Sequence, residues 1–187
     1  MNNLDFKAQT EIQIDIKRIQ EIIDSKIFSS ENIRNPLLES AFTELIIRLR
    51  DLMSKSEKSG NRIKFQDDIV KIDRVNDVTG AIAFVRNAAC HIDSPNNIAN
   101  QSGISIFNVF FGKGKMQIGQ KEYTSDYNDD VCFFYGEQKL YLNRHLIRAF
   151  SEAKGALDNQ GKGHFGMWRS ERFLSFLDHI MQSRRKS

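Results

Sequence analysis

The chain has 187 residues, of which 40% are hydrophobic, with 27 basic and 24 acidic side chains. This length suits one globular domain, and 11 Gly and two Pro are too few for a low-complexity or collagen-like chain. Cys90 and Cys132 form no Cys-x-x-Cys pair, so neither a disulfide framework nor a zinc knuckle is expected. The polar start and the absence of a long apolar run predict a cytoplasmic protein with no membrane partner. The formal charge of +3 is compatible with a nucleic-acid partner but does not by itself indicate one.

Apolar residues at helical spacing predict two long helices in the first third of the chain. The first covers about residues 4–28, and the second starts after Asn35-Pro36, a pair typical of an N-cap and first helical position. From Ser54 to Arg74 the period is lost, which predicts a loop with a short strand at 63–65. The inward stripes are Ile12, Ile16, Ile19, Ile23 and Ile27 in the first helix and Leu38, Phe42, Leu45, Leu49 and Leu52 in the second.

A third helix is predicted from Asn76, as N-cap, to about residue 93, with Pro95 just beyond its end. Residues 104–142 are rich in aromatic and β-branched side chains between turn residues, which predicts a small antiparallel sheet. The expected strands lie near 104–111, 116–118, 131–135 and 139–142. Their aromatic rings favour a sheet core over a surface that stacks RNA bases.

Asn143 is predicted to cap a fourth long helix, followed by a loop at 159–166 and a last helix from about Ser170. The residues expected inward in the fourth helix are Leu146, Phe150, Ala153 and Leu157. The predicted fold class is therefore mainly α: an up-and-down helical bundle of four to five long helices. We expect a single domain over 1–187, with a small antiparallel β insertion at about 104–142.

Three polar side chains of the third helix point to chemistry. Counted at about 100° per residue from Val85, Asn87 and His91 lie at roughly 200° and 240°, away from the apolar stripe. Arg86 lies at roughly 100°, and its long stem would bring the guanidinium to the same place. A cation, an amide and an imidazole are thus expected to converge, whereas Cys90 points elsewhere and is interpreted as a packing residue.

This set suits cleavage of an RNA phosphodiester by the neighbouring 2′-hydroxyl. His91 would move a proton, and Arg86 would stabilise the charge on the phosphoryl oxygens, with no metal or cofactor required. The helix dipole in the last turn favours the imidazolium form of His91. Because one imidazole cannot easily serve both the attacking and the leaving oxygen, we expect a two-fold dimer. Taken singly, these residues are also common on the solvent side of a helix.

Residues 86–91 read Arg-Asn-Ala-Ala-Cys-His, follow Phe84-Val85 and lie in a predicted long helix. This run resembles the Arg-Asn-x-x-x-His signature of the HEPN superfamily (higher eukaryotes and prokaryotes nucleotide-binding domains). The resemblance implies a homodimeric, metal-independent endoribonuclease whose two motifs face each other across a cleft. It implies Arg86 and His91 as the catalytic pair and Asn87 as the polar residue after the Arg. It also implies a toxin or phage-defence role, with a nucleotidyltransferase-type antitoxin as partner.

The main alternative is a non-catalytic HEPN-like module that binds a nucleotide, an RNA or a protein partner through the same face. A DNA-binding regulator is less favoured, because no helix-turn-helix or strong basic patch is recognisable. Scattered histidines at 145, 164 and 179 lack a second ligand four residues away, so no metal site is expected.

Overall fold

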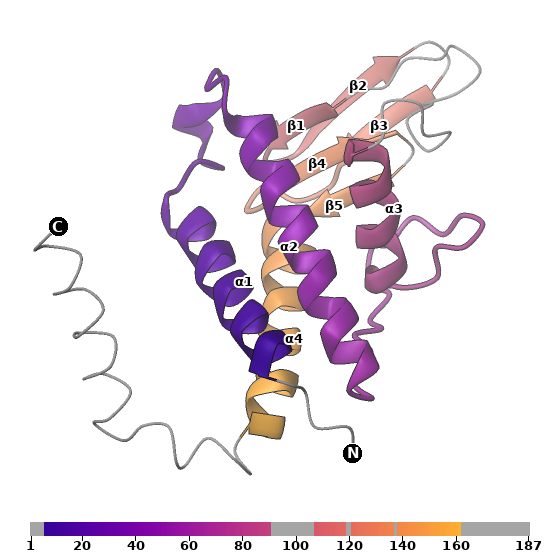
Figure 1. Ribbon diagram of the computed structural model, residues 1–187. Coiled ribbons are helices and arrows are strands. Elements are labelled where there is room, and N and C mark those ends of the chain that lie inside the picture. The colour runs from indigo at the N-terminus through magenta and orange to yellow at the C-terminus, as the bar shows by residue number, and fades with distance from the viewer. Residues whose placement is uncertain (1–5, 91–106, 119–120, 137, 162–187) are drawn as a thin grey trace, which may run out of the picture.

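The computed structural model describes residues 6–90, 107–118, 121–136 and 138–161 (Figure 1). Within these residues the helices are α1 (Phe6–Asp24), α2 (Leu38–Lys58), α3 (Val78–Cys90) and α4 (Arg148–Gly161). A 3₁₀ turn, η1 (Ser30–Asn32), precedes α2, and a π-helical segment, η3 (Leu142–Ile147), leads into α4. The strands are β1 (Phe107–Phe111), β2 (Gly114–Ile118), β3 (Lys121–Ser125), β4 (Val131–Tyr135) and β5 (Gln138–Tyr141).

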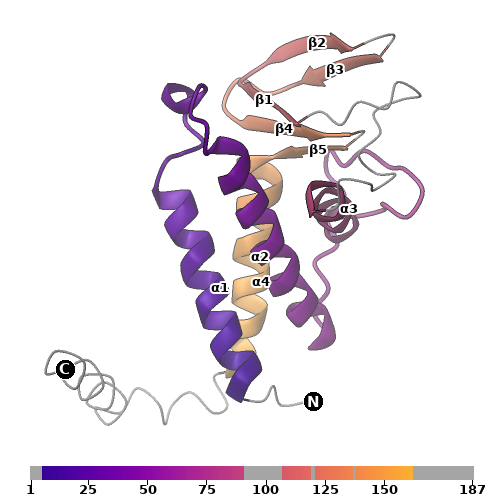
Figure 2. The ribbon, with the colours of Figure 1, turned by 45° about the horizontal axis from the view of Figure 1, so that its top comes forward.

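Helix α2 is central, because it contacts α1, α3 and α4 (Figures 1 and 2). Its predicted stripe is buried throughout, and α1 buries Ile12, Ile16 and Ile19 against it. The first two helices are thus confirmed, although α1, described from Phe6, ends at Asp24 rather than near residue 28. Helix α2 also continues through 54–58, which the sequence predicts as loop.

The segment between α2 and α3 forms no strand at 63–65 and instead holds the start of α3. The Thr79 hydroxyl donates to the Ile63 carbonyl, and the Val78 amide donates to the Phe65 carbonyl at 3.0 Å. The Gly80 amide donates to Oδ1 of Asp77 at 2.7 Å, so the N-cap is Asp77 rather than Asn76. The end predicted for this helix, residues 91–93, lies outside the described residues.

Two antiparallel sheets form one end of the molecule. One has the order β1-β4-β5, and the other is the hairpin β2-β3, whose second strand the sequence analysis missed. Alternate residues of the first sheet face opposite ways. The Phe133 ring lies 5.2 Å from that of Phe28 and 4.5 Å from that of Phe42, whereas Cys132 and Phe134 pack in a second cluster that includes Tyr123 of the hairpin.

The expected bundle with a small β insertion is therefore wrong, and the fold is a mixture of α and β. Helical spacing is a property of each segment taken singly, and it does not show that the helices need one face of the sheet to complete their core. That face carries rings such as Phe133, which is 1% exposed. The interpretation of these aromatic residues as sheet core is confirmed.

The chain enters α4 through η3 rather than through a cap at Asn143. Asp130 accepts hydrogen bonds from the backbone amides of Asn143 at 2.9 Å and Arg144 at 3.1 Å, and the Asn143 side chain also donates to it. Helix α4 continues to Gly161, past the predicted start of the 159–166 loop, and the helix predicted from Ser170 lies outside the described residues. None of the described helices combines the length and hydropathy that crossing a membrane requires.

Candidate functional site

The sequence motif begins on α3, which packs against α2 and contacts β4 and β5. Arg86 is partly buried, and the residues one and two turns before it, Ile82 and Thr79, are both buried. Arg86 therefore leaves the helix at the edge of its packed face. Asn87, one residue further round, is exposed.

Arg86 and Asn87 are brought together. Nη1 of Arg86 donates to Oδ1 of Asn87 at 3.2 Å, so the guanidinium reaches the exposed side of the helix, as its long stem allows. His91 is the first residue after the described part of this helix. Its convergence with Arg86 and Asn87 stays a prediction.

The charge of Arg86 has no acidic neighbour on its own helix, because Val78–Cys90 contains no Asp or Glu. Within 6–90, 107–118, 121–136 and 138–161, its one hydrogen-bond partner is the neutral amide of Asn87. An unneutralised, partly buried guanidinium attracts anions, and its forked donors match a phosphate group. Most other arginines in this part pair with carboxylates: Arg18, Arg48, Arg62, Arg74, Arg144 and Arg148.

Sequence analysis missed a second such arginine, Arg50 on α2. It is partly buried, and its Nη1 atom is buried without a hydrogen-bond partner. Arg48 and Arg50 belong to one Arg-Leu-Arg-Asp run, and nothing in the sequence shows that one is paired and the other is not. The structure pairs Arg48 with Asp15 at 2.9 Å, but it shows no acidic partner for Arg50 among the described residues.

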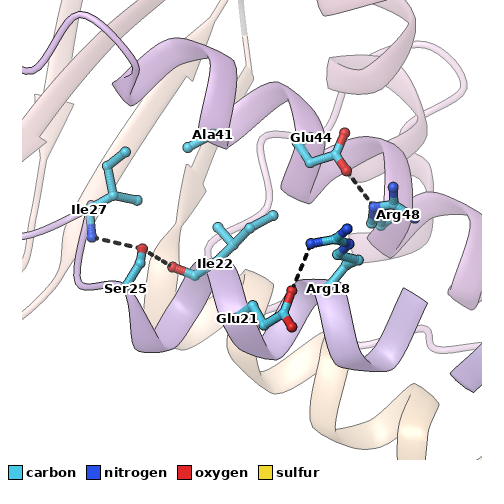
Figure 3. Close-up of a pocket in the computed structure, with 8 residues that line it drawn as sticks. All are labelled: Arg18, Glu21, Ile22, Ser25, Ile27, Ala41, Glu44 and Arg48. Atoms are coloured by element: carbon cyan, nitrogen blue, oxygen red, sulfur yellow. Dashed lines mark hydrogen bonds and ion pairs between the residues drawn. The ribbon is translucent and has the colours of Figure 1, made fainter. Parts of the chain in front are cut away.

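A groove of about 320 Å³ lies between α1 and α2 (Figure 3). The cations on its walls are occupied, because Arg18 pairs with Glu21 at 3.0 Å and Arg48 pairs with Glu44. None of the residues that line it belongs to α3. This groove lacks the unneutralised charge that an RNA phosphate requires.

His145, at the start of the α4 region, is a fully buried structural residue. Its Nδ1 accepts a hydrogen bond from the Tyr141 amide at 3.1 Å, so Nε2 carries the proton and donates to the Asp67 carbonyl at 2.9 Å. Burial lowers the pKa of His145 below its usual 6.5. Both ring nitrogens are occupied, and no His, Cys, Asp or Glu cluster suited to a metal ion occurs in the part of the chain that the structure describes.

The two cysteines lie in different places. Cys132 is fully buried in the second cluster, and burial raises the pKa of its thiol to about 12, so it is not poised as a nucleophile. Cys90, at the end of α3, is partly buried.

No protein-family model matches the chain, and searches of curated proteins and solved structures find no significant similarity. The HEPN resemblance is therefore carried by residues 86–91.

Proposed function

We propose that this protein is a metal-independent endoribonuclease of HEPN type. The observation that carries the proposal is the guanidinium of Arg86, which is partly buried, bonded to the Asn87 amide and paired with no carboxylate among the described residues. It opens the Arg-Asn-x-x-x-His run that ends at His91. An unneutralised arginine beside an imidazole suits a reaction that adds negative charge to a phosphate.

In the proposed reaction, the 2′-oxygen attacks the adjacent phosphorus and the bond from phosphorus to the 5′-oxygen breaks. Arg86 stabilises the charge on the non-bridging oxygens of the transition state. One His91 imidazole takes the proton of the 2′-hydroxyl, and the imidazolium of the partner copy in a homodimer protonates the 5′-oxygen. The products are a 2′,3′-cyclic phosphate and a 5′-hydroxyl. Asn87 orients the guanidinium through their hydrogen bond.

The same proposal extends to the biological role. A ribonuclease of this kind acts as a toxin or phage-defence effector, held in check by a nucleotidyltransferase-type antitoxin. Its substrate would be cytoplasmic RNA, and the free thiols of Cys90 and Cys132 suit a reducing compartment.

The first test is RNA cleavage in EDTA by the wild type, Arg86→Ala, His91→Ala and a control, Arg18→Ala. Arg18 is an exposed arginine on α1, so its removal changes the net charge equally without touching the site. We expect both site variants to lose about 10²- to 10³-fold in cleavage rate, because they lose transition-state charge stabilisation or proton transfer. The melting temperature of Arg86→Ala should stay close to that of the wild type.

Cleavage that survives in both site variants, or that requires an added divalent ion, would contradict the proposal. RNA binding without cleavage by the wild type would favour the non-catalytic module instead. A parallel test in cells measures growth and total RNA after expression: the wild type should slow growth and degrade RNA, and His91→Ala should restore both.

A further inference from the structure

Arg50 is the second partly buried arginine in the described structure that lacks a carboxylate partner. Its Nη1 atom is buried and has no hydrogen-bond acceptor. A buried guanidinium donor without an acceptor costs free energy, because it has given up water and gained nothing in exchange. The fold alone therefore does not account for this side chain.

Ion pairs link the side of α2 that carries Arg50 to the start of α3. Glu57 lies seven residues later, two helical turns, and so shares that side. Glu57 pairs with Arg62, and Arg62 also binds both carboxylate oxygens of Asp77, the N-cap of α3, at 2.9 and 3.0 Å. Arg62 thus connects this side of α2 to the start of α3.

The side of α3 that carries Arg86 is also linked to the segment around Arg62. Thr79 lies two turns before Arg86, and so shares its side of α3. The Thr79 hydroxyl donates to the carbonyl of Ile63, the residue after Arg62. In Figure 1, α2 runs downwards and α3 upwards, and Figure 2 shows that the two helices cross at an angle, with α3 seen nearly end-on. Arg50 precedes Glu57 and Arg86 follows Asp77, so both arginines lie on the same side of this connection along their helices. At 1.5 Å per residue, Arg50 is about 10 Å from Glu57 and Arg86 is about 13 Å from Asp77 along their helices.

We propose that Arg50 is a second phosphate-binding residue of the Arg86 site, contacting the phosphodiester backbone of single-stranded RNA. This inference rests on the proposed ribonuclease function and extends it from α3 to the neighbouring side of α2. Helices α2 and α3 contact each other, so a single RNA strand can reach a guanidinium on each of them. A bound phosphate would give Arg50 its missing acceptors.

The test measures binding rather than cleavage. The probe is a short, fluorescein-labelled 2′-O-methyl RNA, which cannot undergo 2′-oxygen attack, and the readouts are fluorescence anisotropy at several salt concentrations and the melting temperature. The variants are Arg50→Gln, Arg50→Lys and the charge-matched control Arg18→Gln. A parallel arm follows cleavage of unmodified RNA by the wild type.

We expect Arg50→Gln to bind about tenfold more weakly, or worse, since it loses charge-assisted hydrogen bonds. The slope of log affinity against log salt should fall by about 0.7, as for one lost contact to single-stranded RNA. Its melting temperature should equal or exceed that of the wild type, because a donor without an acceptor has been removed. Arg50→Lys should bind less tightly than the wild type, because an ammonium lacks the fork.

Binding by Arg50→Gln that equals that of Arg18→Gln would overturn the inference, as would a lower melting temperature, which indicates a structural residue. If Arg50→Gln fails to fold, Arg50→Lys decides, and unchanged affinity in that variant overturns the inference. If the wild type binds the probe but leaves unmodified RNA intact, the ribonuclease proposal is overturned. The anisotropy series then still shows whether Arg50 contributes to RNA binding. A wild type that binds no RNA overturns both.

Discussion

The two sides of α2 differ in how completely their buried basic side chains are paired. On the side towards α1, Lys55 is 8% exposed and lies 3.3 Å from Asp15, and Arg48 binds the same carboxylate at 2.9 Å. On the side that Arg62 connects to α3, Arg50 has no acidic partner among the described residues, and the one hydrogen bond of Arg86 within these residues is to a neutral amide.

On the side towards α1, the folded structure itself supplies the carboxylates that keep the buried basic side chains charged. Burial opposes the charge of Lys55, but its hydrogen bond to Asp51 and the negative charges of Asp51 and Asp15 outweigh burial and raise its pKa above the usual value. The ammonium stays charged because its partners are in place. On the second side Arg62 is paired with Glu57 and Asp77, but Arg50 and Arg86 have no carboxylate partner among the described residues. Cations without a carboxylate partner are what the proposed RNA-binding role of Arg86 and Arg50 would explain.

Helices α1, α3 and α4 pack against α2 in one core that includes the sheet, and Phe133→Ala tests the cooperativity of this core with the largest expected effect. The Phe133 ring contacts Phe28, Phe42 and Phe107, so its loss leaves a cavity between the sheet and the helices. We expect a loss of about 3–5 kcal/mol in the free energy of unfolding, measured by urea denaturation. Helical circular dichroism and tyrosine fluorescence should report one shared transition, and two separate transitions would show that the sheet folds independently.

Asp15→Ala removes the carboxylate that Lys55 and Arg48 share on the side of α2 towards α1. It removes one charged acceptor from each of Lys55 and Arg48, which keep Asp51 and Glu44, so we expect a loss of about 2 kcal/mol in the free energy of unfolding. RNA cleavage, measured well below the melting temperature, should be unchanged. Arg50→Gln should give the reverse pattern, and equal stability losses in the two variants would remove the contrast between the two sides.

The elements of the first third of the chain could be predicted because their stripes are long and regular, as at Ile12, Ile16 and Ile19. Strand β3 could not, because Lys121–Ser125 is mostly polar and buries Tyr123 and Ser125 only once it pairs with β2. Fold class was missed because spacing shows which face of an element is apolar but not what covers it. Arg86 and Asn87 belong to a local motif that can be recognised in the sequence. Arg50 stands out only in the three-dimensional structure, which shows that no carboxylate among the described residues pairs with it.

The smallest expected effect concerns His145, a buried polar residue whose hydrogen bonds are satisfied. Because burial lowers its pKa, the unfolded chain takes up the proton near pH 6.5, while the folded chain does so only at lower pH. The stability contributed by neutral His145 is therefore fully present above pH 6.5 and decreases as the pH falls through that value.

Melting temperatures of the wild type and His145→Gln at pH 7.5, 6.5 and 5.5 check this expectation. The amide can accept from Tyr141 and donate to Asp67 but does not titrate, so the variant should melt lower at pH 7.5 and lose less on acidification. Parallel pH profiles would show that His145 does not contribute. Cleavage should be retained, since both ring nitrogens of His145 are occupied by hydrogen bonds within the fold.

The most direct test of the central claim, that the unneutralised Arg86 acts in RNA cleavage by the 2′-oxygen, compares RNA and DNA oligonucleotides of one sequence in EDTA. Mass spectrometry of the products identifies the new ends. The account predicts RNA fragments that end in a 2′,3′-cyclic phosphate, intact DNA, and intact RNA with Arg86→Ala. Cleavage of the DNA would contradict it, as would cleavage of the RNA by Arg86→Ala at the rate of the wild type.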